Sequence, residues 1–487
     1  MAWDHRETAN SHAVGKTPKY QQIAEQLTRH IEEGAFSPGE AAPSVRRLSR
    51  QWNVSITTIL KAYYLLEARG LLIPRPRSGF YVSHRLPGAP PEPDLSNPDP
   101  DPSSVGMREL ITMIILRDTL NPRLAQLGAA HPAPELTATR ALNRIMAAAA
   151  RRLGDRAGLY MTPSGNRPLR QQIVKHAVNA GCTLDAEELI ITSGCGEAIS
   201  TCLQAICKPG DTVAVESPIC FDVFQYMENL GLKALEIPTH PRDGISIEAL
   251  RFALENNSVQ ACLVISNFNN PLGSCIPDQR KKELVSLLTR HHVPLIENDI
   301  VADIHYSDKR PLSAKAFDTE GLVLWCGSFS KTLSPGLRVG WAAAGRYRST
   351  VAWLKYSTSM ATATLPQVAV ADFMAEGGYR QHLRRIRRIY QGRVAELRRA
   401  VIRFFPDDIR VTDPAGGYLL WIELPEAIDA LTLYKTALNE GIAITPGHLF
   451  STGNRYRNFI RLNAANWSED VAPAIQRLGR VIEAMLR

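Results

Sequence analysis

Residues 328–341, SFSKTLSPGLRVGW, contain the side chains that decide the fold of most of this chain. Lys331 lies between two hydroxyl residues, and Arg338 follows seven positions later. A lysine amine is a nucleophile toward carbonyl carbon, whereas hydroxyl groups and an arginine bind phosphate. The stretch therefore combines a nucleophile with a phosphate site, although a surface loop could have the same composition by chance.

A phosphorylated aldehyde needs this combination, and pyridoxal phosphate is such a cofactor. Upstream, residues 191–200, ITSGCGEAIS, predict a strand, a glycine-rich turn and the start of a helix. The backbone N–H groups near Cys195 and Gly196 would then point at a phosphate. Helix capping alone would explain the same pattern.

Two further stretches follow in the order that this cofactor predicts. ISNFNNPLGS, at 265–274, ends a strand with Asn270, whose amide would bond the ring hydroxyl. VPLIENDI, at 293–300, is an apolar strand that delivers Asp299, a carboxylate that would keep the pyridine nitrogen protonated. A turn, or a buried aspartate paired elsewhere, would explain these stretches without a cofactor.

The whole chain is too long for one domain. It has 487 residues, 45% hydrophobic and 21% charged, which is typical of a globular protein of two or three domains. It contains no apolar run of about 18 residues and begins with polar residues, so we expect a cytoplasmic protein with no membrane contact. The eight cysteines form no CxxC pair, so we expect reduced thiols and no metal site.

A proline-rich segment divides the chain. Residues 87–102 contain seven prolines among acidic and small residues, and each proline removes a backbone donor. We therefore predict a semi-extended linker over residues 85–107, between a small domain at 16–84 and a large domain at 108–487.

The small domain is basic, with eight Lys and Arg against two Asp and Glu in residues 40–85. This charge favours a polyanion such as nucleic acid, and a solvated surface is the alternative. Helices are predicted over about 18–33, after Ser44 and after Ser55, followed by two short strands, LLIPR and FYV. This order of elements is that of a winged helix-turn-helix.

A winged helix-turn-helix places its third helix in the major groove of duplex DNA. Small hydroxyl residues open that helix here, and arginines on the second helix and on the wing would neutralise phosphates. The residues predicted to contact DNA are Arg46, Arg47, Ser55, Thr57, Thr58, Arg75 and Arg77.

The segment from Lys19 to Val82 resembles GntR-type DNA-binding domains along its whole length. Ile56 stands where that family often has an arginine, which leaves an apolar contact with a thymine methyl at this position. The resemblance implies that DNA is approached by Arg46, Ser55, Thr57, Thr58 and Gly79.

Residues 108–487 resemble fold-type I aminotransferases, which have an α/β fold with a large and a small subdomain. The resemblance implies that Lys331 binds the cofactor covalently and acts in catalysis with Asp299, and that Asn270 holds the ring hydroxyl. It assigns the cofactor phosphate to Cys195, Gly196, Ser328, Ser330 and Arg338. In LYMTPSGNRPLR, Tyr160 would reach the partner subunit's phosphate, and in NFIRLN, Arg461 would bind a substrate carboxylate.

Several positions depart from the aminotransferase pattern. Cys220 replaces the aromatic residue that stacks on the cofactor ring, and Phe221 would point away on an extended strand. Val301 and Ala302 stand where a tyrosine usually bonds the ring hydroxyl, and Gly196 replaces a longer polar side chain. We therefore expect cofactor binding with weak or no transamination.

Residues 379–400 contain eight arginines and one glutamate at helical spacing. A supplementary DNA contact and a solvated interdomain helix both fit this composition. The apolar residues Leu383, Ile386 and Tyr390 give such a helix a packing face, which favours the second interpretation.

The two resemblances together are those of the MocR class of bacterial transcriptional regulators. This class implies a homodimer that binds double-stranded DNA and pyridoxal phosphate. It also implies that an amino compound, or the cofactor itself, is sensed at Lys331 and Arg461. Two alternatives stay open: an active aminotransferase with a vestigial DNA-binding module, and a regulator that no longer holds the cofactor.

Overall fold

The computed structural model describes residues 18–32, 35–36, 39–69, 71–75, 79–83, 90–106, 112, 121, 123–453 and 455–487. The chain separates into two compact units, Met1–Ala89 and Pro90–Arg487. Arg77 on the predicted wing lies outside the described residues. Among the residues that are described, no helix is long and apolar enough to cross a membrane.

The first unit is a winged helix. Its helices α1 (Lys19–Glu32), α2 (Val45–Gln51) and α3 (Ile56–Ala68) precede an antiparallel hairpin of β1 (Leu72–Arg75) and β2 (Gly79–Val82). Gly79 opens β2 with φ +97°, a left-handed conformation that glycine adopts without steric cost. The predicted winged helix-turn-helix is thus confirmed.

Two serines begin the helices of the helix-turn-helix. The Ser44 hydroxyl accepts the Arg47 N–H at 3.2 Å, and the Ser55 hydroxyl accepts the Thr58 N–H at 3.1 Å, so each serine caps its helix as the sequence predicted. The core under these helices includes Ile23, Leu27, Ile31, Leu48, Ile59, Tyr63, Leu66, Leu72 and Val82.

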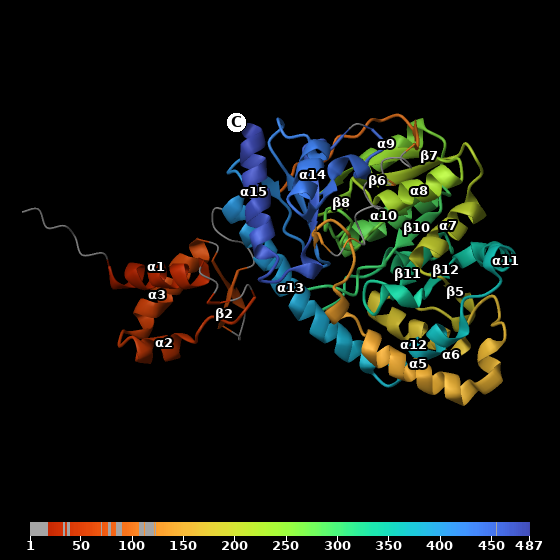
Figure 1. Cartoon of the computed structure of the whole chain (residues 1–487), viewed down its shortest axis with the longest axis horizontal. Coiled ribbons are helices and arrows are strands. Elements are labelled where there is room, and N and C mark those ends of the chain that lie inside the picture. The colour runs from red at the N-terminus through yellow and green to blue at the C-terminus, as the bar shows by residue number, and fades with distance from the viewer. Residues whose placement is uncertain are drawn as a thin grey trace, which may run out of the picture. The chain divides into compact units, whose positions relative to one another are not determined.

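The second unit is built on a mixed sheet in the strand order β3-β7-β6-β9-β10-β11-β12-β5, with β8 beside β7 (Figure 1). The neighbours from β7 to β11 run parallel, whereas β12 runs antiparallel to both β11 and β5. The strands are β3 (Ser103–Ser104), β5 (Leu189–Thr192), β6 (Thr212–Ser217), β7 (Lys233–His240), β8 (Gly244–Ile245), β9 (Val259–Val264), β10 (Leu295–Asn298), β11 (Val323–Ser328) and β12 (Gly340–Ala343).

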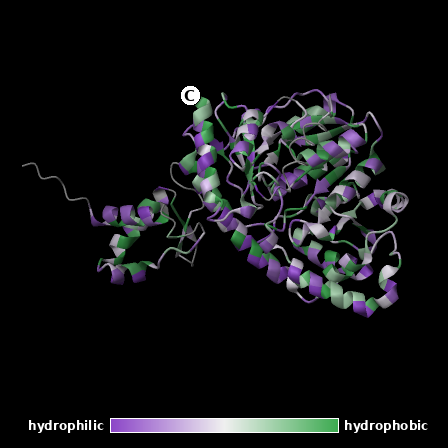
Figure 2. Ribbon diagram, in the orientation of Figure 1, coloured by the Kyte–Doolittle hydropathy of each residue, from purple (hydrophilic) through white to green (hydrophobic). Residues whose placement is uncertain are grey.

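Helices bury both faces of this sheet, as parallel strands require. Along β6, Ala214 packs with one face and its neighbours Val213 and Val215 pack with the other, so the two faces belong to separate hydrophobic cores. Figure 2 shows hydrophobic residues gathered in these layers and hydrophilic residues along outer helices such as α13. The helices of this part are α5 (Thr139–Leu153), α6 (Arg167–Ala177), α7 (Cys195–Ile206), α8 (Phe221–Asn229), α9 (Ile247–Asn256), α10 (Asp278–Arg290), α11 (Arg348–Ser359) and α12 (Thr364–Ala375).

A small subdomain follows α13 (Gly378–Phe404). Its antiparallel sheet has the order β13 (Arg410–Val411), β14 (Leu419–Glu423), β17 (Phe459–Asn463) and β16 (Thr445–Pro446). The remaining elements are β4 (Ala125–Gln126), which pairs with β15 (Ile442–Ala443), and the helices α14 (Ala430–Asn439) and α15 (Ala472–Leu486). The predicted α/β fold with two subdomains is confirmed.

The arginine-rich stretch forms most of α13, and its predicted packing face is present. Leu383, Ile386 and Tyr390 are all buried.

The proline-rich segment differs from its prediction. Residues 90–106, which were predicted to belong to a semi-extended linker between the two domains, are instead part of the second unit. Ser103 and Ser104 form β3 beside β7, and the carbonyl of Pro91 accepts the N–H of Val411 at 3.0 Å. Proline prevents helices, but it does not prevent an extended chain from docking through its carbonyls and polar side chains. We call residues 90–106 the strap.

Candidate functional site

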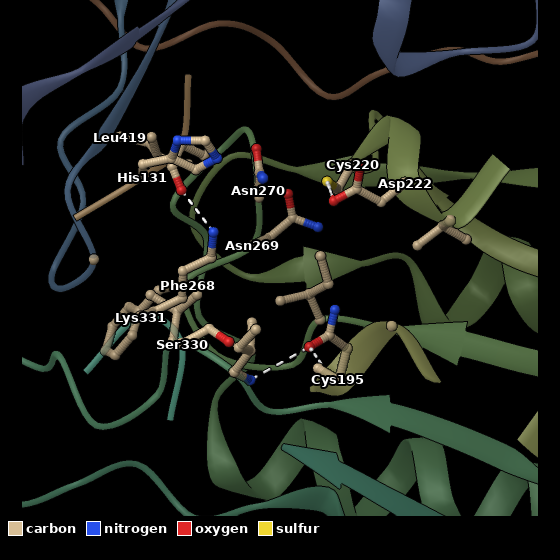
Figure 3. A pocket seen from close by; sticks show the side chains of 18 of the residues that line it. His131, Cys195, Cys220, Asp222, Phe268, Asn269, Asn270, Ser330, Lys331 and Leu419 are labelled. Carbon is tan, nitrogen blue, oxygen red and sulfur yellow. Dashed lines mark hydrogen bonds between the residues drawn. The ribbon is translucent and has the colours of Figure 1, made fainter. Parts of the chain in front are cut away.

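A cavity of about 260 Å³ lies where the carboxyl ends of β9, β10 and β11 meet the N-terminus of α7. Open α/β sheets bind ligands at this edge, because the loops and helix ends there present polar groups. Lys331, Asn270, Cys220 and Asp222 surround the space (Figure 3). The cavity therefore collects residues that are far apart in the sequence.

One end of the cavity is a cradle for an anion. Gly194, with φ +99°, ends the turn before α7, and none of the described acceptors bonds the N–H groups of Cys195 and Gly196. Arg338 is anchored beside this turn, since its Nη2 donates to the Ser193 carbonyl at 2.6 Å and its Nη1 to the Ser330 hydroxyl at 3.4 Å. Backbone donors, a hydroxyl and a guanidinium together suit a phosphate.

Lys331 follows β11 and reaches into the cavity. Its Nζ donates to the Ala130 carbonyl at 2.6 Å. Burial lowers the pKa of its amine, and the nearby Asp222 carboxylate opposes this shift. A lower pKa increases the fraction of neutral amine, which is the form that attacks an aldehyde.

Arg461, on β17, brings a buried guanidinium to the same cavity. It is 1% exposed, and its Nη1 donates to the Asn270 Oδ1 at 2.9 Å and its Nη2 to the Gly128 carbonyl at 2.6 Å. No described carboxylate pairs with it, and its Nε is buried without a hydrogen bond. A buried cation without an anion is costly, so this arrangement suits a ligand carboxylate.

Two residues next to Cys220 lie differently from what the sequence predicted. Phe221 was expected to point away on an extended strand, but it begins α8 and lines the cavity. The centroid of its ring lies 5.9 Å from the Arg461 Cζ. Asp222, which the sequence argument did not single out, lines the cavity as well and accepts the Cys220 thiol at 3.6 Å.

Asp299, a predicted cofactor-binding residue, does not line the cavity. Its carboxylate accepts the Arg310 Nη2 at 2.5 Å and the Trp325 Nε1 at 2.7 Å, and it does not line the cavity, whereas Asn298 does. Successive residues at the end of a strand point to opposite sides, so Asn298 faces the cavity and the predicted Asp299 does not. Asn298 could have been found from the alternation of LIEN, in which Glu297 is buried on the opposite face beside Ser266.

Two other assigned residues do not line the cavity either. Ser328 is buried, donates to the Val339 carbonyl at 3.0 Å and accepts the Ser330 N–H at 3.1 Å, so it supports Ser330. Tyr160 is 82% exposed on the surface. Cys195, Gly196, Asn270, Ser330, Lys331, Arg338 and Arg461 all line the cavity as the sequence suggested.

His131 is a further cavity residue that no sequence pattern indicated. Burial, followed by the charges of Lys331 and Arg461, lowers its pKa to about 4. The imidazole is therefore neutral at physiological pH and adds no third positive charge to the cavity.

The winged helix presents the predicted DNA-contacting residues on one helix-turn-helix. Arg46 and Arg47 on α2 are exposed, as are Ser55 and Thr57 at the start of α3. Ser55 and Thr58 share a hydrogen bond of 2.8 Å between their hydroxyls. Arg75 belongs to β1, but its side chain lies outside the described residues.

The exposed face of α3 carries Ile56, for which the sequence left an apolar contact with DNA, and two residues that the sequence argument did not name. Ile56 is exposed at the start of the helix, and Lys61 and Tyr64 follow it on the exposed surface. Tyr64 lies 6.0 Å from the ring of Phe80 on the wing.

Comparisons with known proteins agree with both units. The family of bacterial regulatory proteins named gntR matches residues 19–82, and the aminotransferase class I and II family matches residues 133–478. YjiR of Escherichia coli K12, an uncharacterized HTH-type transcriptional regulator, is 37% identical over 465 residues, which are 95% of this chain and 98% of YjiR. The HTH-type regulator NorG of Staphylococcus aureus USA300 is 27% identical over 90% of this chain and 98% of its own length.

Solved aminotransferases share the fold of the second unit. LysN of Thermus thermophilus, an α-aminoadipate aminotransferase complexed with N-(5'-phosphopyridoxyl)-L-leucine, has a TM-score of 0.71 and 28% identity, and the match covers 76% of this chain and 95% of LysN. A multiple substrate aminotransferase of Thermococcus profundus also has a TM-score of 0.71, with 25% identity over 78% of this chain and 95% of its own. The chain therefore belongs to the MocR kind of HTH-type transcriptional regulators, in which a GntR DNA-binding domain is joined to a pyridoxal phosphate-dependent aminotransferase class I and II domain.

Proposed function

We propose that this regulator senses a small amine that carries a carboxylate, and that occupation of the cavity changes its affinity for DNA. The observation that carries the proposal is the buried Arg461, which has no carboxylate partner among the described residues and shares a cavity with Lys331. An amino acid offers both groups that this pair would bind. Pyridoxal phosphate alone is the other candidate signal.

The cavity fits the cofactor. Lys331 would hold its aldehyde carbon, and Asn270 would bond its ring hydroxyl. Ser330, Arg338 and the N–H groups of Cys195 and Gly196 would hold its phosphate. When bound, pyridoxal phosphate supplies an aldehyde that condenses with a primary amine, which gives the protein a covalent means of recognising amines.

A homodimer is part of the proposal. Tyr160 and its neighbour Leu159 are exposed, as are Trp353, Tyr356 and Met360 on and after α11. Contiguous exposed apolar side chains mark association surfaces, and the ring centroids of Trp353 and Tyr356 lie 5.8 Å apart. Tyr160 would there reach the partner's cofactor phosphate. Because the protein has a DNA-binding domain, we also propose that it works in the cytoplasm.

The test of the cofactor site is reduction with borohydride. The full chain incubated with pyridoxal phosphate should acquire one reduced pyridoxyl group on Lys331, and Lys331→Ala should acquire none. Lys208→Ala, which removes an exposed lysine, is the control and should label normally. A label on another lysine, or no label on the wild type, would contradict the assignment.

The test of DNA binding is its salt dependence. We expect Arg46→Ala and Arg47→Ala in the full chain each to weaken binding and to lower the log–log salt slope by about 0.9, the value for one lost phosphate contact. Arg69→Ala, at the opposite end of α3, should leave the slope unchanged. If all three variants bind like the wild type, α2 does not face the DNA backbone.

A further inference from the structure

The end of β10 presents two neighbouring polar residues to different surroundings. Asn298 lines the cofactor cavity. Asp299 is held outside the cavity by Arg310 and Trp325, and Arg310 also donates its Nε to Asp303 at 2.9 Å. The strand that supplies a carboxylate to the ring nitrogen in the aminotransferase pattern therefore supplies an amide here.

The hydrogen bonds of Asn298 fix which end of its amide is free. Its Oδ1 accepts the Cys195 thiol at 3.4 Å and the backbone N–H of Ile300 at 3.3 Å. Two donors converge on this atom, so it must be the oxygen. Burial raises the pKa of the Cys195 thiol, so the thiol remains a donor at physiological pH.

The amide nitrogen of Asn298 is left for a ligand. The side chain is 8% exposed where it lines the cavity, and no acceptor in the described part of the chain bonds its Nδ2. The charged groups that share the cavity are Lys331, Arg338 and Arg461, against the single carboxylate of Asp222. The cavity thus offers the ring an N–H donor in a surrounding that is positive overall.

We infer that this cavity binds pyridoxal phosphate with its ring nitrogen unprotonated, as the acceptor of the Asn298 Nδ2, and that the bound cofactor recognises amines without removing their α-proton. A carboxylate stabilises a protonated pyridine by charge, whereas an amide N–H bonds only the unprotonated nitrogen. A protonated ring is the electron sink that α-proton removal requires, but condensation of an amine with the aldehyde does not need it.

This inference rests on the proposed function, and it explains why a chain with Lys331 and Arg461 in place can act as a receptor. The same inference accounts for the departures at Cys220 and Val301. The residues for ring stacking, for ring-hydroxyl bonding and for ring charge are all altered. The residues that would bind the phosphate, the aldehyde and the carboxylate remain.

The experiment compares Asn298→Asp with the wild type and with Asp299→Asn, all as full chains loaded with pyridoxal phosphate. The wild type should shift its absorption maximum when α-amino acids are added, yet exchange their α-protons for deuterium slowly. Asn298→Asp should increase the exchange rate by about 10- to 100-fold, the effect of one hydrogen bond to a charged group. Asp299→Asn should keep the wild-type spectrum and exchange rate and lose only stability.

Nitrogen NMR of the wild type loaded with ring-¹⁵N pyridoxal phosphate gives a second readout that needs no variant and no turnover. A chemical shift typical of unprotonated pyridine is expected. A protonated shift, or fast α-proton exchange by the wild type, would overturn the inference and leave the sensing proposal intact. A spectrum altered by Asp299→Asn but not by Asn298→Asp would also overturn it, whereas failure to bind the cofactor at all would remove both proposals.

Discussion

Among single residues, Arg461 indicates the chemistry of the ligand most specifically. Its guanidinium is enclosed by the rings of Phe221 and Phe450, and its hydrogen bonds go to neutral oxygens of Asn270, Gly128 and Thr445. Burial lowers its pKa, yet an arginine keeps its charge. A buried cation held by neutral partners gains most from an arriving anion.

We therefore expect Arg461→Gln to raise the apparent Kd of α-amino acids by about 10- to 100-fold, because a hydrogen bond to a charged group contributes about 1.5–3 kcal/mol. Absorption titration of the cofactor-loaded protein measures this. Simple amines that lack a carboxylate provide the control and should bind both proteins alike. Equal weakening for both ligand types would show that Arg461 maintains the cavity and does not bind the carboxylate.

At the same scale, the sequence located the site well because its residues differ in chemistry from their neighbours. Lys331 between hydroxyl residues gained its meaning from the stretches that accompany it, and the family resemblance added Arg461; both residues line the cavity. Asn298 and Asp299 are adjacent polar residues, and only the direction of the strand end separates them. The residue type favoured the Asp299 carboxylate, whereas the backbone turns the Asn298 amide toward the cavity.

Among the elements, a buried ionic cluster around Asp303 connects α6, α13 and the segment that carries Arg310. Its carboxylate accepts the Arg310 Nε at 2.9 Å, the His176 Nε2 of α6 at 2.8 Å and the Tyr379 hydroxyl of α13 at 2.8 Å. Burial alone would raise the pKa of Asp303, but His176 and Arg310 outweigh it and hold this pKa well below its usual range.

A depressed pKa contributes stability above the unfolded-state pKa, near 4, and that stability disappears as pH falls through the folded-state pKa. We expect Asp303→Asn to lose about 3–5 kcal/mol of unfolding free energy at pH 7, because it breaks buried ion pairs with Arg310 and His176, although Arg310 keeps its pair with Asp299. The difference from the wild type should shrink below about pH 4. Urea unfolding at several pH values measures it, with exposed Asp308→Asn as the control; a loss that does not depend on pH would argue against the ionic explanation.

Elements marked by local signals were predicted closely, whereas docking of an extended segment was not. Ser44 and Ser55 cap helices through hydrogen bonds three residues away, so a short window of sequence contains the information. The strap depends on partners hundreds of positions away, such as Val411 for Pro91. The composition of the strap shows only prolines and acidic residues, which suit a solvated linker as well as they suit a docked segment.

At the scale of the whole molecule, the strap directly follows the first unit, which ends at Ala89, and it contacts segments of the second unit that lead to the ligand cavity. Glu92 joins the two subdomains, because it accepts the Asp413 N–H at 3.0 Å and pairs with Arg242. Ser96 donates to the Ser217 carbonyl at 2.5 Å and accepts the Thr239 N–H at 2.7 Å.

Both strap contacts adjoin segments that reach the cavity. Ser217 precedes Cys220 by three residues, and Asp413 precedes Gly416 by three, and both Cys220 and Gly416 line the cavity. A ligand that moved either segment would disturb the hydrogen bonds of the strap. We therefore expect the proposed coupling to DNA binding to depend on these contacts.

We expect the double variant Glu92→Ala, Ser96→Ala to bind amino acids and DNA separately with near wild-type affinity, yet to lose most of the change in DNA affinity that we propose the amino acid causes. Coupling between two sites is commonly about 5- to 150-fold in affinity, so its loss is measurable by DNA titration with and without the ligand. Asp101→Asn, on an exposed part of the strap, is the control and should retain the coupling. If the double variant also retains it, the signal leaves the cavity by a route other than these strap contacts, because the anchors would be gone while both binding sites remained intact.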